Sequence, residues 1–293
     1  MQREWKNEEK LPGEIRRVIE RFVGFVREAF EYFEISQPEI FLEIGERVCG
    51  IDLEESTENE LFLGVGIEPV SNSQNSRRIA WHETCHWENA LNGKPTLLKR
   101  RPKYKKLDYY LFDGKLKKQV HENLLPKRLE TEESEALYRR FYNVISDVIV
   151  AKRIVKSPVF KSTLIGLTEE LMSWEPLSIR RTDLGYACKR VAAIAMEIEY
   201  AFPPMNMPRK HIHRLRKTEK AQLQKIFQVF PHLEPTYNAL RSLFEEIIFT
   251  TDVQKFHSWI MDGLSTFPSE ALPFMAREYI NDLSSMGVET QVS

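Results

Sequence analysis

The sequence predicts an α+β fold, with helices and a small β-sheet in its first half and an all-α second half. Apolar residues recur at helical spacing through residues 13–35, and three short β-type runs follow within residues 40–67. Beyond residue 158 the patterns are helical and are punctuated by prolines. We therefore expect two domains, residues 1–157 and residues 158–293, with the helical domain packed against the first.

The elements of the first half follow one another in a definite order. Residues 13–35 predict an amphipathic helix, and residues 40–44, 47–53 and 61–67 predict strands. A second helix is predicted over residues 77–92, because this stretch contains neither proline nor glycine. Asn75 or Ser76 is the expected cap at its start, and Gly93 is expected to end it.

That second helix carries His82-Glu83-Thr84-Cys85-His86, an HExxH motif. Residues four apart share one face of a helix, so His82 and His86 can present two imidazole nitrogens to one metal ion. Glu83 can stand beside a metal-bound water and act as its general base. The alternative is a buried helix whose histidines form hydrogen bonds with their neighbours. Glu88 is a departure, since zinc peptidases usually carry an apolar residue there, and its cost is small if its side chain reaches the helix surface.

A catalytic zinc ion needs a third protein ligand and an open position. A helix predicted over residues 132–155 is apolar on nearly every side of its segment 141–150, yet it carries Asn143 and Asp147 on one face. A buried carboxylate is costly unless it is paired or coordinated, which favours Asp147 as the third ligand. Asn143 would lie beside it, as an alternative ligand or holding a ligand in orientation. A salt bridge from Asp147 to an arginine such as Arg140 is the alternative.

The two motifs together resemble those of the zincins, and more narrowly those of the gluzincins. The second gluzincin motif places a ligating glutamate four residues before an aspartate that steadies a histidine ligand. Here Ile145-Ser146-Asp147 matches the end of that motif, and Asn143 stands at the glutamate position. The Asn-x-x-x-Asp form is also similar to metallopeptidase domains found beside von Willebrand A-like modules, in which the aspartate is favoured as the ligand. The resemblance covers roughly residues 35–155.

This resemblance implies a zincin-like first half and a zinc-dependent peptidase. In zincins the last strand before the HExxH helix lies along the cleft, and extended peptides pair with its edge. We expect residues 61–67 to have that role, because Gly64 and Gly66 leave room for a neighbouring backbone. An ordinary hairpin strand with glycines at a bend is the alternative.

A basic segment, residues 98–128, joins the two motifs. It holds eleven lysines and arginines against Asp108, Asp113 and Glu122, with aromatic residues interleaved. Such a segment can bind nucleic acid, or it can be a solvated insertion whose aromatics pack on the body. If it borders the cleft, its charge favours acidic substrates. His121 lies within it and is a candidate donor to a substrate oxyanion, although a surface histidine is the simpler interpretation.

The second half predicts helices without recognisable catalytic chemistry. They are expected at residues 162–174, 182–201, 209–230, 235–249, 252–266 and 268–285. The chain has no apolar run of membrane-spanning length and no signal-peptide core at its start. Its three cysteines are few and far apart, which favours reduced thiols in a cytoplasmic protein.

We therefore expect a zinc-dependent peptidase with one zinc ion per chain on His82, His86 and Asp147 and with Glu83 as general base. His121 and Tyr142 are the candidate oxyanion donors. The expected partner is a peptide or protein substrate. Two other functions stay open, namely a catalytically inactive zincin-fold interaction protein and a nucleic-acid-associated protein that uses residues 98–128.

Overall fold

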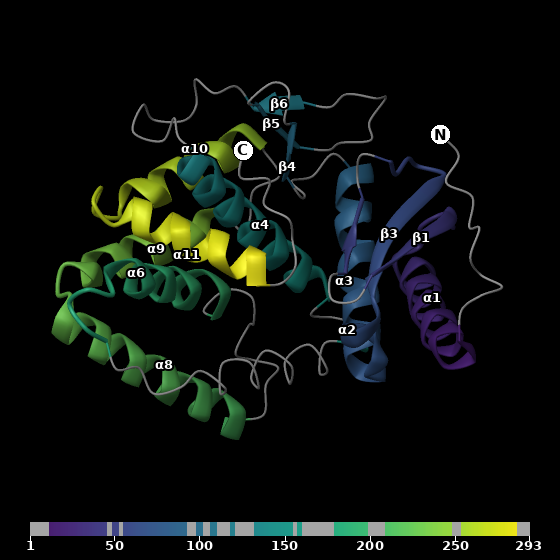
Figure 1. The fold of residues 1–293 in the computed structure, drawn as a ribbon, viewed down its shortest axis with the longest axis horizontal. Coiled ribbons are helices and arrows are strands. Elements are labelled where there is room, and N and C mark those ends of the chain that lie inside the picture. The colour runs from purple at the N-terminus through teal and green to yellow at the C-terminus, as the bar shows by residue number, and fades with distance from the viewer. Residues whose placement is uncertain are drawn as a thin grey trace. The chain divides into compact units, whose positions relative to one another are not determined.

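The structure is a computed structural model. It describes residues 12–45, 49–52, 55–92, 98–101, 106–109, 118–120, 132–154, 157–159, 179–198, 209–247 and 253–285. The fold is mixed α+β and mostly helical, as the sequence predicts (Figure 1). The chain divides into two compact units, Met1–Glu88 and Asn89–Ser293. These units are groups of residues that pack mainly with one another. The predicted domain boundary after residue 157 stays a prediction.

The first unit holds the elements that were expected before and within the HExxH motif. They are helix α1 (Gly13–Phe33), strands β1 (Glu39–Gly45), β2 (Gly50–Ile51) and β3 (Glu60–Gly66), helix α2 (Ile67–Ser71) and most of helix α3 (Ser73–Leu91). The predicted strand over residues 47–53 is represented by the two residues of β2, and part of that range lies outside the described residues.

The sheet of the first unit has the strand order β1-β3-β2. Strand β3 pairs in parallel with β1 over all seven residues of both strands. On its other side it pairs with β2 in antiparallel fashion, with Gly50 opposite Gly64. Our expectation that residues 61–67 present an open edge is therefore wrong, because β3 is the middle strand. The outer strands of this sheet, among those described, are β1 and β2.

Helix α1 is amphipathic, and its apolar face forms the core of the first unit with β3. The buried side chains of this core include Phe22, Val26 and Phe30 of α1 and Leu61 and Leu63 of β3. The helix ends where Glu34 adopts the left-handed conformation (φ 55°) and the backbone N–H of Ile35 donates to the carbonyl of Phe30. This is a Schellman-type C-cap with glutamate at the position that usually holds glycine.

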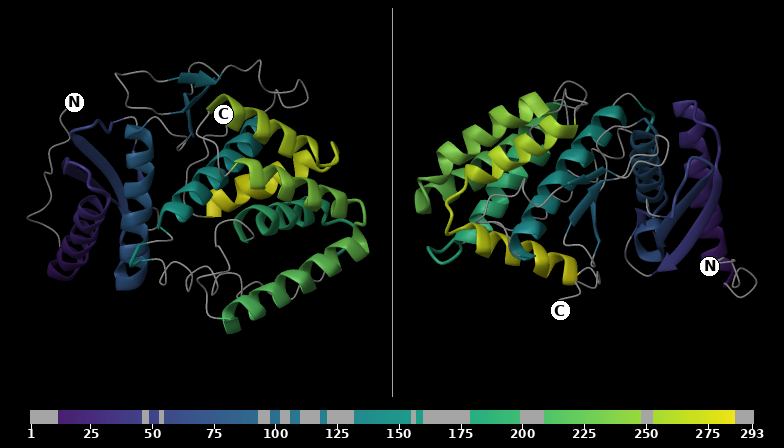
Figure 2. Two further views of the ribbon diagram at one scale, coloured as in Figure 1. Left: turned by 180° about the vertical axis from the view of Figure 1, so that it is seen from behind. Right: turned by 90° about the horizontal axis from the view of Figure 1, so that it is seen from above.

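The second unit combines a small sheet with a group of helices. Its sheet is antiparallel, in the order β4-β5-β6, with β4 at Leu98–Arg101, β5 at Lys106–Tyr109 and β6 at Lys118–Val120. Its helices are α4 (Glu132–Ile154), α6 (Leu184–Ala193) with a π-helical continuation (Ile194–Ile198), α8 (Arg209–Val229), α9 (Leu233–Ile247), α10 (Val253–Ser265) and α11 (Leu272–Ser285). Both views in Figure 2 show α11 beside α4.

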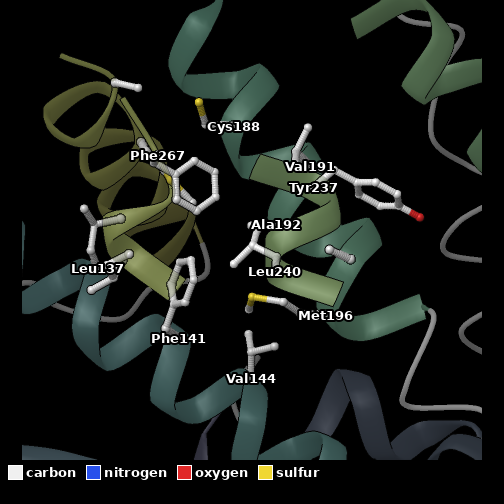
Figure 3. Close-up of a cluster of buried hydrophobic side chains, with 14 of the residues drawn as sticks. Leu137, Phe141, Val144, Cys188, Val191, Ala192, Met196, Tyr237, Leu240 and Phe267 are labelled. Atoms are coloured by element: carbon white, nitrogen blue, oxygen red, sulfur yellow. The ribbon is translucent and has the colours of Figure 1, made fainter. Parts of the chain in front are cut away.

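These helices enclose one apolar core. Side chains from α4, from α6 and its π-helical continuation, and from α9 point toward one another, as Figure 3 shows for Phe141, Val191, Met196 and Leu240. The predicted helix over residues 182–201 is thus confirmed in position but changes to π geometry at Ile194. The helix predicted at residues 162–174 lies outside the described residues. Within the described part of the chain, no helix combines the length and the apolarity needed to cross a bilayer.

Candidate metal centre

Helix α3 carries the HExxH residues, and a side chain caps its first turn. The Asn72 Oδ1 atom accepts hydrogen bonds from the backbone N–H groups of Gln74 at 2.9 Å and of Asn75 at 3.2 Å. These are the two N–H groups that an N-cap side chain satisfies, so Asn72 is the N-cap. The sequence-based choice of Asn75 or Ser76 is wrong. The Asn75 amide instead donates to the carbonyl of Pro69 at 2.7 Å.

Aromatic side chains hold α3 against α1. The ring centroids of Trp87 and Phe30 are 5.5 Å apart, and those of Trp81 and Tyr32 are 5.0 Å apart. The indole N–H of Trp87 also donates to the backbone carbonyl of Thr57 at 3.2 Å. Because the two tryptophans lie just before and just after the motif, their contacts fix the rotation of this helix about its axis. The histidines are therefore oriented by packing before any ligand binds.

The two histidines of the motif face one another across one helical turn. Their Nε2 atoms lie 3.1 Å apart, and their ring planes are at 82°. The His86 side chain is buried, whereas His82 is half-buried. Two zinc–nitrogen bonds at a tetrahedral angle place the nitrogens about 3.3 Å apart, so the observed distance suits a shared metal ion. A hydrogen bond between neutral imidazoles has a similar length. A third ligand is therefore needed to distinguish a metal site from a hydrogen-bonded histidine pair.

Asp147 of helix α4 is that third group. His82, His86 and Asp147 each offer one ligand atom, and the three atoms lie within 4.8 Å of one another. Asp147 is half-buried on a helix whose other described side chains are largely buried and apolar. Two imidazoles and one carboxylate match a zinc site that keeps a fourth position open. The three residues predicted as ligands thus form a group that could hold a metal ion, although these donor types also suit other divalent ions.

Glu83 lies on the same helix, 8% exposed, next to His82. The Cys49 thiol lies near its carboxylate. Burial raises the pKa of this thiol above its usual value, the backbone hydrogen bond with Gly66 lowers it, and the negative charge of Glu83 raises it. The N–H of Gly66 donates to the Cys49 sulfur at 3.1 Å. Sequence reasoning missed Cys49, because only the pairing of β2 with β3 brings it near the motif.

Other predicted site residues have different surroundings. Asn143 is half-buried one turn before Asp147, and its backbone carbonyl accepts a hydrogen bond from the Ser146 hydroxyl at 2.9 Å. Tyr142 is buried in the core of the second unit. His121 lies outside the described residues. The roles of Asn143 as a further or orienting ligand, and of Tyr142 and His121 as oxyanion donors, stay predictions.

The last turns of α3 are enclosed on all sides. Every residue from 83 to 90 is buried, so this part of the helix has no exposed face. The condition under which Glu88 would cost little is therefore not met, since Glu88 is only 5% exposed. Asn89 is 1% exposed and follows His86 by three positions. Neither polar atom of its amide has a hydrogen-bond partner in the part of the chain that the structure describes.

The basic segment between the two motifs is described only in part. The backbone of residues 98–101, 106–109 and 118–120 forms the second sheet, and their side chains lie outside what the structure describes. A nucleic-acid partner for this segment stays a prediction.

The chain was compared with protein-family models, with curated proteins and with solved structures. No significant match was found in any of the three comparisons. The assignment of a function therefore depends on the residues of the site themselves.

Proposed function

We propose that this protein is a zinc-dependent peptidase of the zincin type. One observation carries the proposal: the two HExxH histidines and Asp147, from separate helices, bring three ligand atoms within 4.8 Å of one another. Three protein ligands with the fourth position left to water are characteristic of catalytic zinc, whereas structural zinc sites usually have four protein ligands. The zincin-like architecture of the first half is part of this proposal.

The proposed metal ligands and Glu83 have separate tasks in this mechanism. His82, His86 and Asp147 would hold the metal, and the packing of Trp81 and Trp87 keeps the histidines in place. A bound zinc ion would lower the pKa of water to about 7 and polarise a carbonyl group. Glu83 takes the proton from the attacking water.

The rest of the cycle also uses Glu83. The same carboxylate then donates the proton to the amine that leaves, so one group serves as base and acid in turn. The Glu83 side chain is 8% exposed, so bulk water has little access to it. We propose Tyr142 or His121 as the donor to the oxyanion.

The proposed substrate is an extended peptide or protein segment. Since β3 is paired on both sides, we propose that such a segment adds to the outer strand β2. The negative charge of Glu83 raises the pKa of Cys49, the residue that precedes β2.

Metal content of the purified full chain is the decisive measurement. We expect about one zinc ion per chain in the unaltered protein and in Glu83→Gln, and loss of zinc in His82→Ala and Asp147→Ala. His213→Ala is a matched control, because His213 is an exposed histidine of α8. Loss of metal in His82→Ala alone would exclude Asp147 as the third ligand. Absence of metal in the unaltered chain, even after zinc is supplied, would refute the proposal.

Hydrolysis of an unfolded protein substrate separates an enzyme from an inactive scaffold. Glu83→Gln should retain its zinc and lose at least about 100-fold in rate, since general acid–base catalysis contributes 10²–10⁴-fold. If the unaltered protein binds zinc and cleaves no peptide bond in a diverse peptide mixture, the inactive zincin-fold interaction protein replaces the peptidase.

A further inference from the structure

Residues of helix α1 and strand β1 line a groove in the first unit. Strand β1 is at the opposite edge of the sheet from β2. The groove has a volume of about 670 Å³. Its apolar lining comes from Ile19 and Val23 of α1 and from Ile40 and Leu42 of β1. None of the three residues proposed as metal ligands lines this groove, and binding of a ligand in it does not depend on the proposed peptidase activity.

The backbone of β1 can accept another strand along this groove. The N–H of Glu39 donates to the carbonyl of Asn59, so the polar backbone groups of Glu39 point toward β3. In a parallel ladder these groups alternate in direction from one residue to the next. The N–H and C=O groups of Ile40, Leu42 and Ile44 therefore point away from β3. No described strand pairs with that side of β1.

The charges around the groove favour a basic occupant. Glu20 and Glu31 of α1 and Glu39 of β1 line it, with Arg27 as the single described cation among the lining residues. All four side chains are exposed, so they are available to a molecule that lies in the groove. Lysine and arginine can place their aliphatic stems on an apolar floor while their charged ends reach carboxylates at the rim. An apolar groove bordered by glutamates therefore suits lysine and arginine side chains.

We propose that this groove binds an extended, basic segment of a partner protein, which adds to the sheet as a strand beside β1. Three outward-facing residues at two-residue spacing cover about 13 Å of strand, so a segment of five residues would use all of them. Backbone hydrogen bonds to β1 supply affinity, and alternate lysine or arginine side chains that enter the groove supply specificity.

The test uses the full chain and fluorescently labelled peptides. The probe has the repeating sequence Thr-Lys over nine residues, and the comparison peptide has Thr-Glu. We expect the lysine peptide to bind with a Kd in the micromolar range by fluorescence anisotropy, more weakly as salt is added, and the glutamate peptide not to bind. The double variant Glu31→Lys, Glu39→Lys should weaken binding about tenfold, because each reversal turns an attraction into a repulsion.

Two controls separate strand addition from simple charge attraction. Glu58→Lys changes the same charge at an exposed residue outside the groove and should leave binding unchanged. In a paired strand, every second backbone N–H of the peptide points toward β1. Methylation of these nitrogens removes the hydrogen-bond donors and should abolish binding, whereas methylation of the other set should not. Equal binding of the methylated peptide, or an equal loss in Glu58→Lys, would overturn the proposal. So would a dimer of the protein that Glu39→Lys dissociates, since a second copy would then occupy the groove.

Discussion

Replacement of Gly185 by alanine is expected to destabilise the protein, although alanine is the better helix former. A Cβ atom at Gly185 of α6 would lie 2.5 Å from the Cβ and 2.7 Å from the carbonyl carbon of Phe274, and 3.0 Å from the backbone nitrogen of Met275. Carbon atoms in good contact are about 3.5–4.0 Å apart. Two of the three atoms belong to the backbone of α11, so rotation of a side chain cannot relieve the overlap.

The size of the effect follows from two opposing contributions. Overpacking of this kind costs about 1–3 kcal/mol, and the higher helix propensity of alanine returns about 0.5–1 kcal/mol. We expect a net loss of about 1–2 kcal/mol in the free energy of unfolding, measured by urea denaturation. Gly24→Ala is the matched control, because Gly24 is an exposed residue of α1 with nothing within 4 Å of the added Cβ. That variant should gain about 0.5–1 kcal/mol. Equal stabilisation of both variants would refute the close approach of α6 to α11.

Two further predictions concern the surroundings of the proposed site. Glu83→Gln removes the negative charge that opposes ionisation of Cys49. The pKa of Cys49 should therefore fall, and alkylation of Cys49 at pH 8 should become faster. Cys188 is the control and should stay unreactive in both proteins, because burial and the charge of Glu270 raise its pKa to about 12. An unchanged alkylation rate at Cys49 would contradict the placement of Glu83. Asn89→Leu removes two buried amide atoms that have no hydrogen-bond partner among the described residues. It should stabilise the protein by about 1–3 kcal/mol in urea denaturation, and a loss of stability would show that the amide is satisfied.

Local patterns in the sequence predict much of the fold. The helical spacing of apolar residues in 13–35 corresponds to α1, and the apolar run with two buried tryptophans corresponds to α3. Asp147 is also identifiable from local evidence, as a carboxylate on an apolar helix. These features could be predicted because a helix buries its apolar face wherever it packs.

Features that depend on pairing or packing between distant segments were not predictable in the same way. The order β1-β3-β2 requires parallel pairing between strands that are not consecutive, and the alternation within residues 61–67 is the same for a middle strand as for an outer one. The burial of Glu88 depends on which elements surround α3. The cap at Asn72 was missed because α3 begins earlier than its apolar pattern does.

The parallel pairing of β1 with β3 also affects how the protein is made. The ribosome completes β1 before it begins β3, and each pair of the register joins residues 21 positions apart, as Glu39 and Glu60 are. At 5–20 residues per second, β1 waits about 1–4 s for its partner strand. Helix α1 has been synthesised by then, and its apolar face can cover the side chains of β1 during the delay. We therefore expect the helix that precedes the sheet to shield the apolar side chains of β1 from aggregation while β3 is being synthesised.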